Sequence, residues 1–339
     1  MNILFTCAGR RNYLINYFKQ ELNGTGKVFA ADMQTTAPAL IDSDFAILAP
    51  SIYDDSYIDF LKETVSKHNI KAIISLNDLE LPILAKNKAE IEKFGARVIV
   101  SNPGAINIAF DKWETVKFLK ENNLKTPNTY IELSKAKEAL SNGSLKFPVV
   151  VKPRWGSASI AVDFAEDEEE LELVYKLQTN KLKKSILATA SIEDLDRAIL
   201  IQEKIKGVEY GMDVLNDLDG NYFHSFVRQK LSMRSGETDK AISIVDENLD
   251  KIGATIGENL RHIGNLDCDV FYDGSDFYVL ELNPRFGGGY PFSHEAGINT
   301  PAIYIDWLNG ESNIEKHNKY KAGIAFAKCD RLLDITNGL

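Results

Sequence analysis

Glu281, Asn283 and Arg285 occupy every second position near the end of a predicted strand, residues 277–282. Side chains alternate along a strand, so we expect these three to share one face. Carboxylate and amide oxygens are the ligands that Mg²⁺ uses when it also binds phosphates. The fixed fork of an arginine suits a phosphoryl oxygen better than a lysine does. The spacing therefore indicates a site for magnesium and phosphate.

A second strand is predicted just before this one, and the dipeptide Asp273-Gly274 between them favours a tight hairpin turn. The hairpin brings a further oxygen ligand, either Asp269 or Asp267, from the partner strand. The alternative interpretation is an exposed hairpin with ordinary surface acids, because acidic residues are common near turns. The residues before the hairpin in the sequence are needed to choose between a metal site and a surface hairpin.

A buried strand is predicted at residues 147–153, and it carries Lys152 near its end. The loop that follows contains Gly156, Ser157 and Ser159, and such small residues let backbone N–H groups approach an anion closely. This is not a P-loop, because the glycine-rich run before Gly-Lys-Ser/Thr is absent. Small-residue turns are common between strands, so the loop by itself favours a phosphate site only slightly.

The first 105 residues alternate predicted strands with predicted helices, which indicates a doubly wound parallel sheet with helices on both faces. Ligands of such sheets bind beyond the carboxyl ends of the strands. That edge carries Gly9-Arg10-Arg11, Asp32 and residues 77–80. The first turn has one glycine where the dinucleotide fingerprint has three, so NAD is not expected.

Two of these loops carry polar side chains that suit a small substrate. Arg10 and Arg11 precede a helix, where they suit a carboxylate or phosphate, or form a solvated helix start. Asn77, Asp78 and Glu80 suit an amine or hydroxyl group, or cap the following helix. Both alternatives stay open from the sequence.

Composition excludes several other classes of protein. With 339 residues, 44% of them hydrophobic and 26% charged, the chain fits a globular protein of two or three domains. A net charge of −10 argues against nucleic-acid binding, which uses a basic face. No apolar run approaches the roughly 20 residues of a membrane span. Three cysteines without metal-ligand spacing or even pairing indicate a reduced, cytoplasmic protein.

A new pattern begins after the break at Asn102-Pro103-Gly104. A helix is predicted at 111–122, and strands are predicted at 198–205, 207–215 and 224–230. Residues 232–239 are polar and are predicted to form a mobile loop that carries Arg234. An amphipathic helix at 246–263 leads into the hairpin of the metal site.

These segments together resemble the ATP-grasp superfamily, in particular a single grasp module of the carbamoyl-phosphate synthase large-subunit type. The most specific match is Glu281-Leu282-Asn283-Pro284-Arg285, which is similar to the metal-binding Glu-x-Asn-Pro-Arg motif of that family. The other matches occur in the family's order: Asp111-Lys112, then Lys152-Pro153 with its small-residue loop, then Glu203-Lys204-Ile205 with Glu209.

The resemblance implies an α/β and α+β architecture. A Rossmann-like pre-ATP-grasp domain is expected at residues 1–105, followed by a two-part ATP-grasp domain at 106–310. Its smaller, nucleotide-clamping part covers about 110–205 and its larger, metal-binding part about 206–310. Residues 311–339 are expected to form a C-terminal extension that packs on the body.

The resemblance also implies a role for each matching residue. Those expected to hold ATP are Lys112 and Lys152 at the phosphates, Gly156, Ser157 and Ser159 on the covering loop, Glu203, Lys204 and Ile205 at the adenine, and Glu209 at the ribose. Those expected to bind Mg²⁺ or Mn²⁺ are Asp269, Glu281 and Asn283. Those expected to stabilise the transferring phosphoryl group are Arg285, Lys230 and Arg234, and Arg228 is a looser match.

The activity that the resemblance implies is an ATP-dependent carboxylate–amine ligase forming a C–N bond, or a carboxylate–thiol ligase. The carboxylate takes the γ-phosphate to give an acyl phosphate, with two Mg ions, and the nucleophile then displaces phosphate. The alternatives are a carboxylate kinase like carbamoyl-phosphate synthase and a catalytically silent, ATP-binding regulatory protein. We expect small-molecule carboxylate and amine substrates, no nucleic acid, no membrane, and a homodimer as one option.

Overall fold

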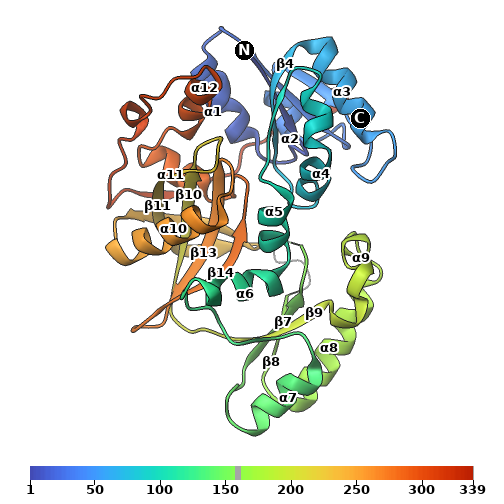
Figure 1. Cartoon of the computed structure of the whole chain (residues 1–339), viewed down its shortest axis with the longest axis vertical. Coiled ribbons are helices and arrows are strands. Elements are labelled where there is room, and N and C mark those ends of the chain that lie inside the picture. Colours follow the sequence, from blue (N-terminus) through green and yellow to red (C-terminus); the bar gives the residue numbers. More distant parts are fainter. Residues whose placement is uncertain (157–161, 339) are drawn as a thin grey trace.

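A five-stranded parallel sheet opens the chain (Figure 1). The structure is a computed structural model that describes residues 1–156 and 162–338. The strands, in the spatial order β3-β2-β1-β4-β5, are β1 Asn2–Thr6, β2 Lys27–Asp32, β3 Phe45–Leu48, β4 Ile70–Ser75 and β5 Arg97–Ile99. The helices are α1 Asn12–Leu22, α2 Pro38–Asp42, α3 Tyr57–His68, α4 Leu81–Glu92 and α5 Pro103–Phe110. The predicted doubly wound sheet is confirmed.

Apolar residues buried on both faces explain why this sheet is parallel. Ile3, Leu4 and Phe5 of β1 are completely buried, so consecutive side chains on opposite faces are all covered. On one face Phe5 packs edge-on against Phe18 of α1, with ring centroids 5.0 Å apart. The covered faces leave the carboxyl edge of the sheet free to line a site.

A four-stranded antiparallel sheet follows, with the spatial order β6-β9-β7-β8. Its strands are β6 Thr129–Tyr130, β7 Val149–Pro153, β8 Asp163–Ala165 and β9 Ile199–Glu203. The helices of this region are α6 Lys112–Glu121, α7 Leu133–Ser141, α8 Glu168–Leu182 and α9 Leu187–Ala190, with a 3-10 turn at Ile192–Arg197. Buried residues of α7 and α8 pack against β7 and β9 in one apolar cluster. This sheet carries the predicted phosphate-binding lysine.

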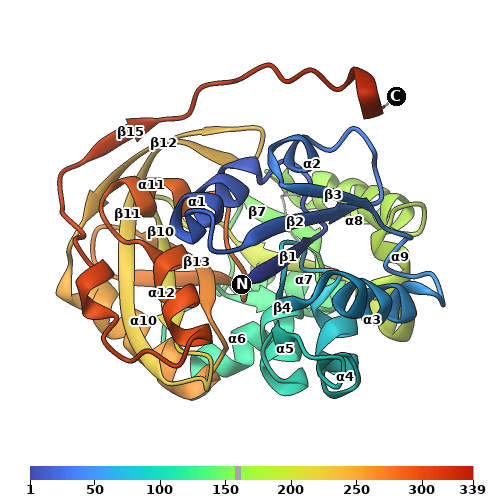
Figure 2. The ribbon, with the colours of Figure 1, turned by 90° about the horizontal axis from the view of Figure 1, so that it is seen from above.

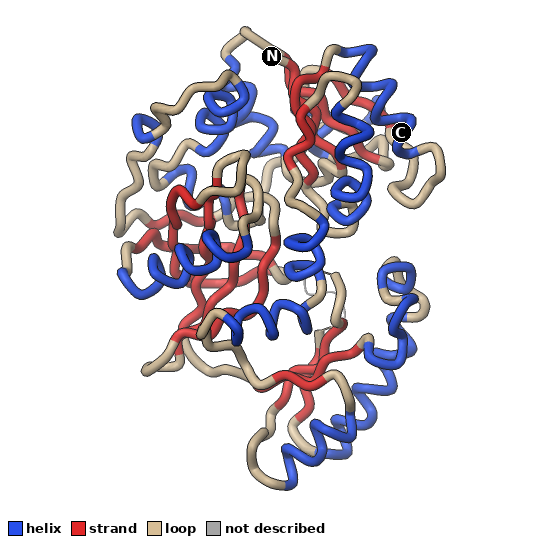
Figure 3. The backbone as a smooth tube through the Cα atoms, in the orientation of Figure 1, coloured by secondary structure: helices blue, strands red, loops and turns tan. Residues whose placement is uncertain are grey.

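A six-stranded antiparallel sheet completes the fold (Figure 3), with the spatial order β14-β13-β10-β11-β12-β15. Its strands are β10 Val208–Asn216, β11 Tyr222–Arg234, β12 Glu237–Ile244, β13 Asn265–Tyr272, β14 Phe277–Asn283 and β15 Ala325–Ala327. The helices are α10 Glu247–Leu260, α11 Tyr290–Glu295 and α12 Thr300–Leu308, with 3-10 turns at Glu315–His317 and Thr336–Gly338. The predicted hairpin is confirmed as β13 and β14.

One prediction of local structure was wrong. Residues 232–239 are not a loop, because β11 continues through Arg234, turns at Ser235-Gly236 with positive φ values of 51° and 79°, and returns as β12. At Asn102-Pro103-Gly104, where a new pattern was predicted to begin, α5 starts. The Asn102 side chain accepts a hydrogen bond of 3.0 Å from the Ala105 amide, and proline fits the first helical turn.

The C-terminal segment connects the six-stranded sheet to the N-terminal sheet. β15 pairs with β12, and Figure 2 shows the chain beyond it running back to the side where α2 lies. Arg331 contacts Asp42 of α2 at 2.6 Å, and Gly338 accepts a hydrogen bond from Thr35. None of the described helices combines the length and apolarity that crossing a bilayer requires.

Candidate active site

One cavity of about 620 Å³ is lined by residues of the two antiparallel sheets and of the segments that follow β1 and β4 in the N-terminal sheet. The predicted site residues that line it are Lys112, Lys152, Gly156, Glu203, Lys204, Ile205, Glu209, Lys230, Asp269, Glu281, Asn283 and Arg285. Ser157 and Ser159 lie outside the described residues. Arg234 does not line the cavity, and its half-exposed side chain pairs with Asp330 at 2.8 Å and Asp239 at 3.1 Å. The structure therefore gives Arg234 no place in the site.

The end of the cavity between the four- and six-stranded sheets has apolar walls and a polar edge. Val150, Phe164 and Leu280 are among its lining residues, and the Lys204 ammonium lies 4.4 Å from the centre of the Phe164 ring. β9 ends at Glu203, so the backbone of Lys204 and Ile205 lies outside the strand ladder. This arrangement suits a flat heterocycle with hydrogen-bonding groups at its edge.

Lys112 and Lys152 bring two buried positive charges into the cavity. Burial lowers the pKa of Lys152 to about 8, because Glu281 compensates only partly and the nearby Lys112 charge lowers it further. Lys112 begins α6, and its ammonium donates to the Gly156 carbonyl. Within residues 1–156 and 162–338, neither lysine forms an ion pair with a carboxylate. Both charges are available to an anionic ligand.

Asp111 and Arg154 fix the backbone on which Lys112 is mounted. The Asp111 carboxylate caps α6 by accepting from the Trp113 amide at 2.9 Å, and it accepts two hydrogen bonds of 2.7 Å from the Arg154 guanidinium. The Lys112 amide donates to the Arg154 carbonyl at 3.1 Å. The acid of the predicted Asp111-Lys112 motif is therefore structural.

An acidic floor is formed where β13 and β14 pair. The strand register places Asp269 opposite Glu281, and the Asn283 amide donates to the Glu281 carboxylate at 3.3 Å. The Lys230 ammonium bridges Asp269 at 2.7 Å and Glu209 at 2.6 Å. Burial, with the neighbouring Asp267 and Glu281 charges, raises the pKa of Asp269 to about 6 although Lys230 opposes the shift.

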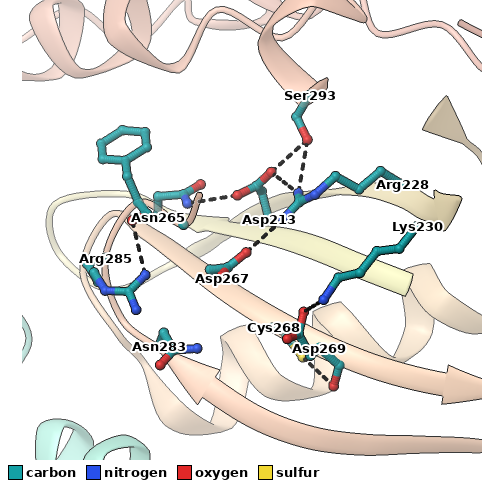
Figure 4. Close-up of polar contacts among 12 residues, drawn as sticks. Asp213, Arg228, Lys230, Asn265, Asp267, Cys268, Asp269, Asn283, Arg285 and Ser293 are labelled. Carbon is teal, nitrogen blue, oxygen red and sulfur yellow. Dashed lines mark hydrogen bonds and ion pairs between the residues drawn. The ribbon is translucent and has the colours of Figure 1, made fainter. Parts of the chain in front are cut away.

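The structure separates the two aspartates between which the sequence could not choose. Asp267 is engaged by Arg228, whose Nη2 lies 2.7 Å from its carboxylate (Figure 4). The other arm of Arg228, Nη1, contacts Asp213 at 2.5 Å and Ser293 at 3.3 Å. Asp269 instead lies on the strand position that faces Glu281. Both aspartates line the cavity, and Asp267 lies opposite Asn283, so they differ in their partners: Arg228 for Asp267, and Glu281 and Lys230 for Asp269.

Arg285 lies beyond the end of β14 and connects the hairpin to the N-terminal sheet. β14 ends at Asn283, so Arg285 does not continue the predicted strand face, yet it still lines the cavity. Its Nε and Nη2 contact one oxygen of Asp78 at 3.0 and 2.5 Å, and both side chains are buried. Asp78 is thus the partner of the arginine rather than a helix cap.

The polar residues of the N-terminal loops divide into cavity-lining and structural groups. Asn77, Asp78 and Arg11 line the cavity, and the exposed Arg10 does not. Glu80 is completely buried outside the cavity and accepts hydrogen bonds from Tyr57, Ser75 and Thr6. Burial raises the pKa of Glu80, with these hydrogen bonds opposing the shift.

Glu237, Gly288 and Gly289 also line the cavity, and sequence reasoning missed them. A Cβ at Gly287 would lie 2.1 Å from the Asp267 carboxyl carbon, and one at Gly289 would lie 2.3 Å from the Arg228 guanidinium. Neither glycine has a positive φ. The run Gly287-Gly288-Gly289 was the available signal, because consecutive glycines mark close approach by other groups.

Two family models match the chain in tandem. A model described as the PylC-like N-terminal domain matches residues 3–99. A model described as the ATP-grasp domain matches residues 109–289. The second match covers the four-stranded sheet and the β13–β14 hairpin, and therefore most residues that line the cavity.

Two curated relatives illustrate the range of similar proteins. The carbamoyl phosphate synthase large chain of Clostridium acetobutylicum is 22% identical over 305 residues, which are 84% of this chain and 27% of that protein. The D-alanine–D-alanine ligase of Thermotoga maritima is 29% identical over 203 residues, which are 58% of this chain and 63% of that ligase. The chain therefore spans about a quarter of the synthase large chains it matches.

Solved structures share the fold at low sequence identity. The L-amino acid ligase from Bacillus licheniformis superposes with a TM-score of 0.68 at 18% identity, covering 91% of this chain and 75% of that chain. The N5-carboxyaminoimidazole synthetase from Staphylococcus aureus gives a TM-score of 0.66 at 17% identity, covering 92% and 77%.

Proposed function

Because the chain belongs to the ATP-grasp family of ATP-binding ligases, we propose that it is a carboxylate–amine ligase that works through an acyl phosphate. One observation carries the proposal. Two buried lysines, a pair of facing carboxylates and a buried arginine line the same cavity. Such a site positions phosphates and stabilises the charge that spreads during phosphoryl transfer.

Different groups of lining residues are assigned to the adenine, the ribose and the phosphates of ATP. We assign the adenine to the part of the cavity lined by Glu203, Lys204 and Ile205, where the backbone of Lys204 and Ile205 lies outside the strand ladder. Lys112 and Lys152 supply the positive charge for the phosphates, and Glu209 lies on β10 where it can accept from the ribose. Lys152 supports this assignment most strongly, because a buried ammonium without a carboxylate partner among the described residues is costly unless an anion neutralises it.

We propose Asp269, Glu281 and Asn283 as the magnesium ligands. Within the part of the chain that the structure describes, no group of three His, Cys, Asp or Glu side chains could hold a metal by itself. Two carboxylates and an amide still fit magnesium, which takes its remaining ligands from nucleotide phosphates and water. Bound there, the ion supplies charge neutralisation on the transferring phosphate.

In the proposed reaction the protein positions the substrates and stabilises the transferring phosphoryl group, and it forms no covalent bond with either. A carboxylate oxygen of the substrate attacks the γ-phosphorus of ATP, and ADP leaves to give an acyl phosphate. Arg285, held by Asp78, stabilises the phosphoryl oxygens, and Lys230 adds a second positive charge from β11. The amine nitrogen then attacks the acyl carbon and phosphate leaves.

The test is ADP release from MgATP with a panel of carboxylates: the twenty L-amino acids, D-alanine, and short mono- and dicarboxylates. Hydroxylamine serves as the trapping nucleophile. We expect at least one carboxylate to stimulate ADP release and to yield its hydroxamate. Glu281→Ala should abolish both, whereas Glu258→Ala, at an exposed position on α10, should not.

Two outcomes would contradict the proposal. A folded protein that binds ATP but releases no ADP with any carboxylate is the silent regulatory alternative. If hydroxylamine yields a hydroxamate but no amine of a matching panel yields an amide, the protein is the carboxylate kinase instead.

A further inference from the structure

Arg11 differs from the other arginines that line the cavity in its lack of a close acidic partner. It follows β1, and its nearest carboxylate among the described residues is that of Glu237, 3.4 Å from Nη1 and 53% exposed. Arg228 and Arg285 each have a carboxylate oxygen at 2.5 Å and are buried. The charges of these two are satisfied within the protein, and that of Arg11 is largely not.

One edge of the Arg11 guanidinium is unused. Nη1 donates to the Tyr13 hydroxyl at 3.2 Å and to Glu237, and the Tyr13 hydroxyl donates to the Gly287 carbonyl at 3.2 Å. In residues 1–156 and 162–338, Nε and Nη2 make no hydrogen bond. These two nitrogens form the edge with which an arginine holds a carboxylate by two parallel hydrogen bonds.

Among the described residues, the carboxylate within ion-pairing distance of Arg11 has a second cation beside it. Glu237 is shared between Arg11 at 3.4 Å and Lys328 at 3.3 Å, so that two cations face one carboxylate. Both contacts are long for charge-assisted hydrogen bonds, which are usually about 2.7–2.9 Å. A ligand with a single negative charge would neutralise this group.

Gly288 allows its backbone to approach the Arg11 guanidinium closely. A Cβ at this position would lie 2.7 Å from Arg11 Nη1 and 3.3 Å from the carboxyl carbon of Glu237. Gly288 has no positive φ, so its backbone conformation does not call for glycine. A side chain at this position would therefore displace the guanidinium, which lines the same cavity as Gly288 and Glu237.

We propose that Arg11 binds the carboxylate of the acid substrate through Nε and Nη2, with Glu237 and Tyr13 as positioning residues that fix its guanidinium. This assignment rests on the proposed ligase function and names the residue that selects a carboxylate. The substrate site then extends from the acidic floor to the carboxyl edge of the N-terminal sheet. An amide or ester of the same acid would lose the ionic contact.

The test compares Arg11→Met and Arg11→Lys with Arg10→Met, which removes the same charge from the exposed neighbour outside the cavity. The probe is the panel carboxylate that gives the fastest ADP release with the unmodified protein. Arg11→Met should raise the KM for this carboxylate by about 10- to 100-fold, the effect of losing charge-assisted hydrogen bonds. The KM for ATP and the melting temperature should stay unchanged.

Arg11→Lys should raise the carboxylate KM less than Arg11→Met, because it keeps the charge and loses the fork. Gly288→Ala is a second route, since its methyl group displaces the guanidinium without removing it, and it should raise the same KM alone. Arg10→Met should change neither KM.

Equal carboxylate KM values for Arg11→Met, Arg10→Met and the unmodified protein would overturn the assignment of Arg11 and leave the ligase proposal standing. A protein without any carboxylate-stimulated ADP release would overturn both.

Discussion

Two pairs of buried cations line the same cavity and differ in their surroundings. Lys112 and Lys152 form no ion pair with the described residues, and burial lowers the pKa of Lys152 to about 8. Arg228 and Arg285 have carboxylate oxygens at 2.5 Å, and nearby acids hold the pKa of each above its ordinary value although burial opposes this. The described part of the fold gives the two lysine charges no acidic partner, whereas each arginine charge has one.

The difference shows that a buried positive charge has two uses. A charge paired inside the protein fixes the chain, because removing either partner strands the other in an apolar setting. An unpaired charge costs stability in the free protein and is compensated when an anion binds. The comparison therefore predicts opposite effects on stability for the two pairs.

The largest expected effect is on the paired side. Arg228→Met leaves Asp213 and Asp267 buried without their cation, so we expect the free energy of unfolding to fall by about 3–5 kcal/mol. Urea denaturation followed by circular dichroism measures it. The double variant with Asp213→Asn should recover part of the loss, because one of the stranded charges is then gone. A loss below about 1 kcal/mol would contradict the structural role of this cluster.

The sequence predicted cations on both sides of this comparison, with Arg228 as a loose match, but it did not predict the acidic partners of the two arginines. Lys152 and Glu281 lie in short local patterns, a strand end and an alternating motif, and such patterns survive into the structure because strand geometry is local. The contact between Arg285 and Asp78 joins residues 207 positions apart, and no local pattern encodes it. The same holds for Arg11 and Glu237, which are 226 positions apart.

The polar composition of residues 232–239 led to the wrong prediction of a loop in place of two strands. Residues 232–239 are polar because much of the β11–β12 ribbon is exposed at its far end, and exposure of a strand was mistaken for absence of one. The parallel sheet was predictable because its strands are buried on both faces.

Lys152→Met probes the unpaired side and should have the next largest effect. We expect the dissociation constant for MgATP to rise by about 100-fold, equivalent to about 2.8 kcal/mol. The free energy of unfolding should stay constant or increase, because a buried charge without a partner is removed. Calorimetric titration and thermal melting measure the two quantities. Lys206→Met, at an exposed position, is the control, and a marked loss of stability in Lys152→Met alone would break the comparison.

The pH dependence of ATP binding should show a smaller effect of the same origin. Burial lowers the pKa of Lys152 to about 8, so its ammonium is present below pH 8 and is lost as the pH rises through that value. ATP affinity should therefore fall above pH 8 by up to about tenfold per pH unit. Titrations between pH 7 and 9.5 measure it. If the decline is equally steep in Lys152→Met, another group is responsible.

The smallest effect is expected for Arg234, which the family resemblance placed beside the phosphate. Its side chain is half exposed and pairs with Asp330 and Asp239 on the surface, where ion pairs contribute little. Arg234→Met should change the free energy of unfolding by less than about 0.5 kcal/mol and kcat by less than about twofold. Steady-state ADP release and urea denaturation, run beside Arg228→Met, measure both. A tenfold fall in kcat with unchanged stability would show that this arginine reaches the phosphate after ATP binds, and that exposure in the free protein does not exclude a cation from the site.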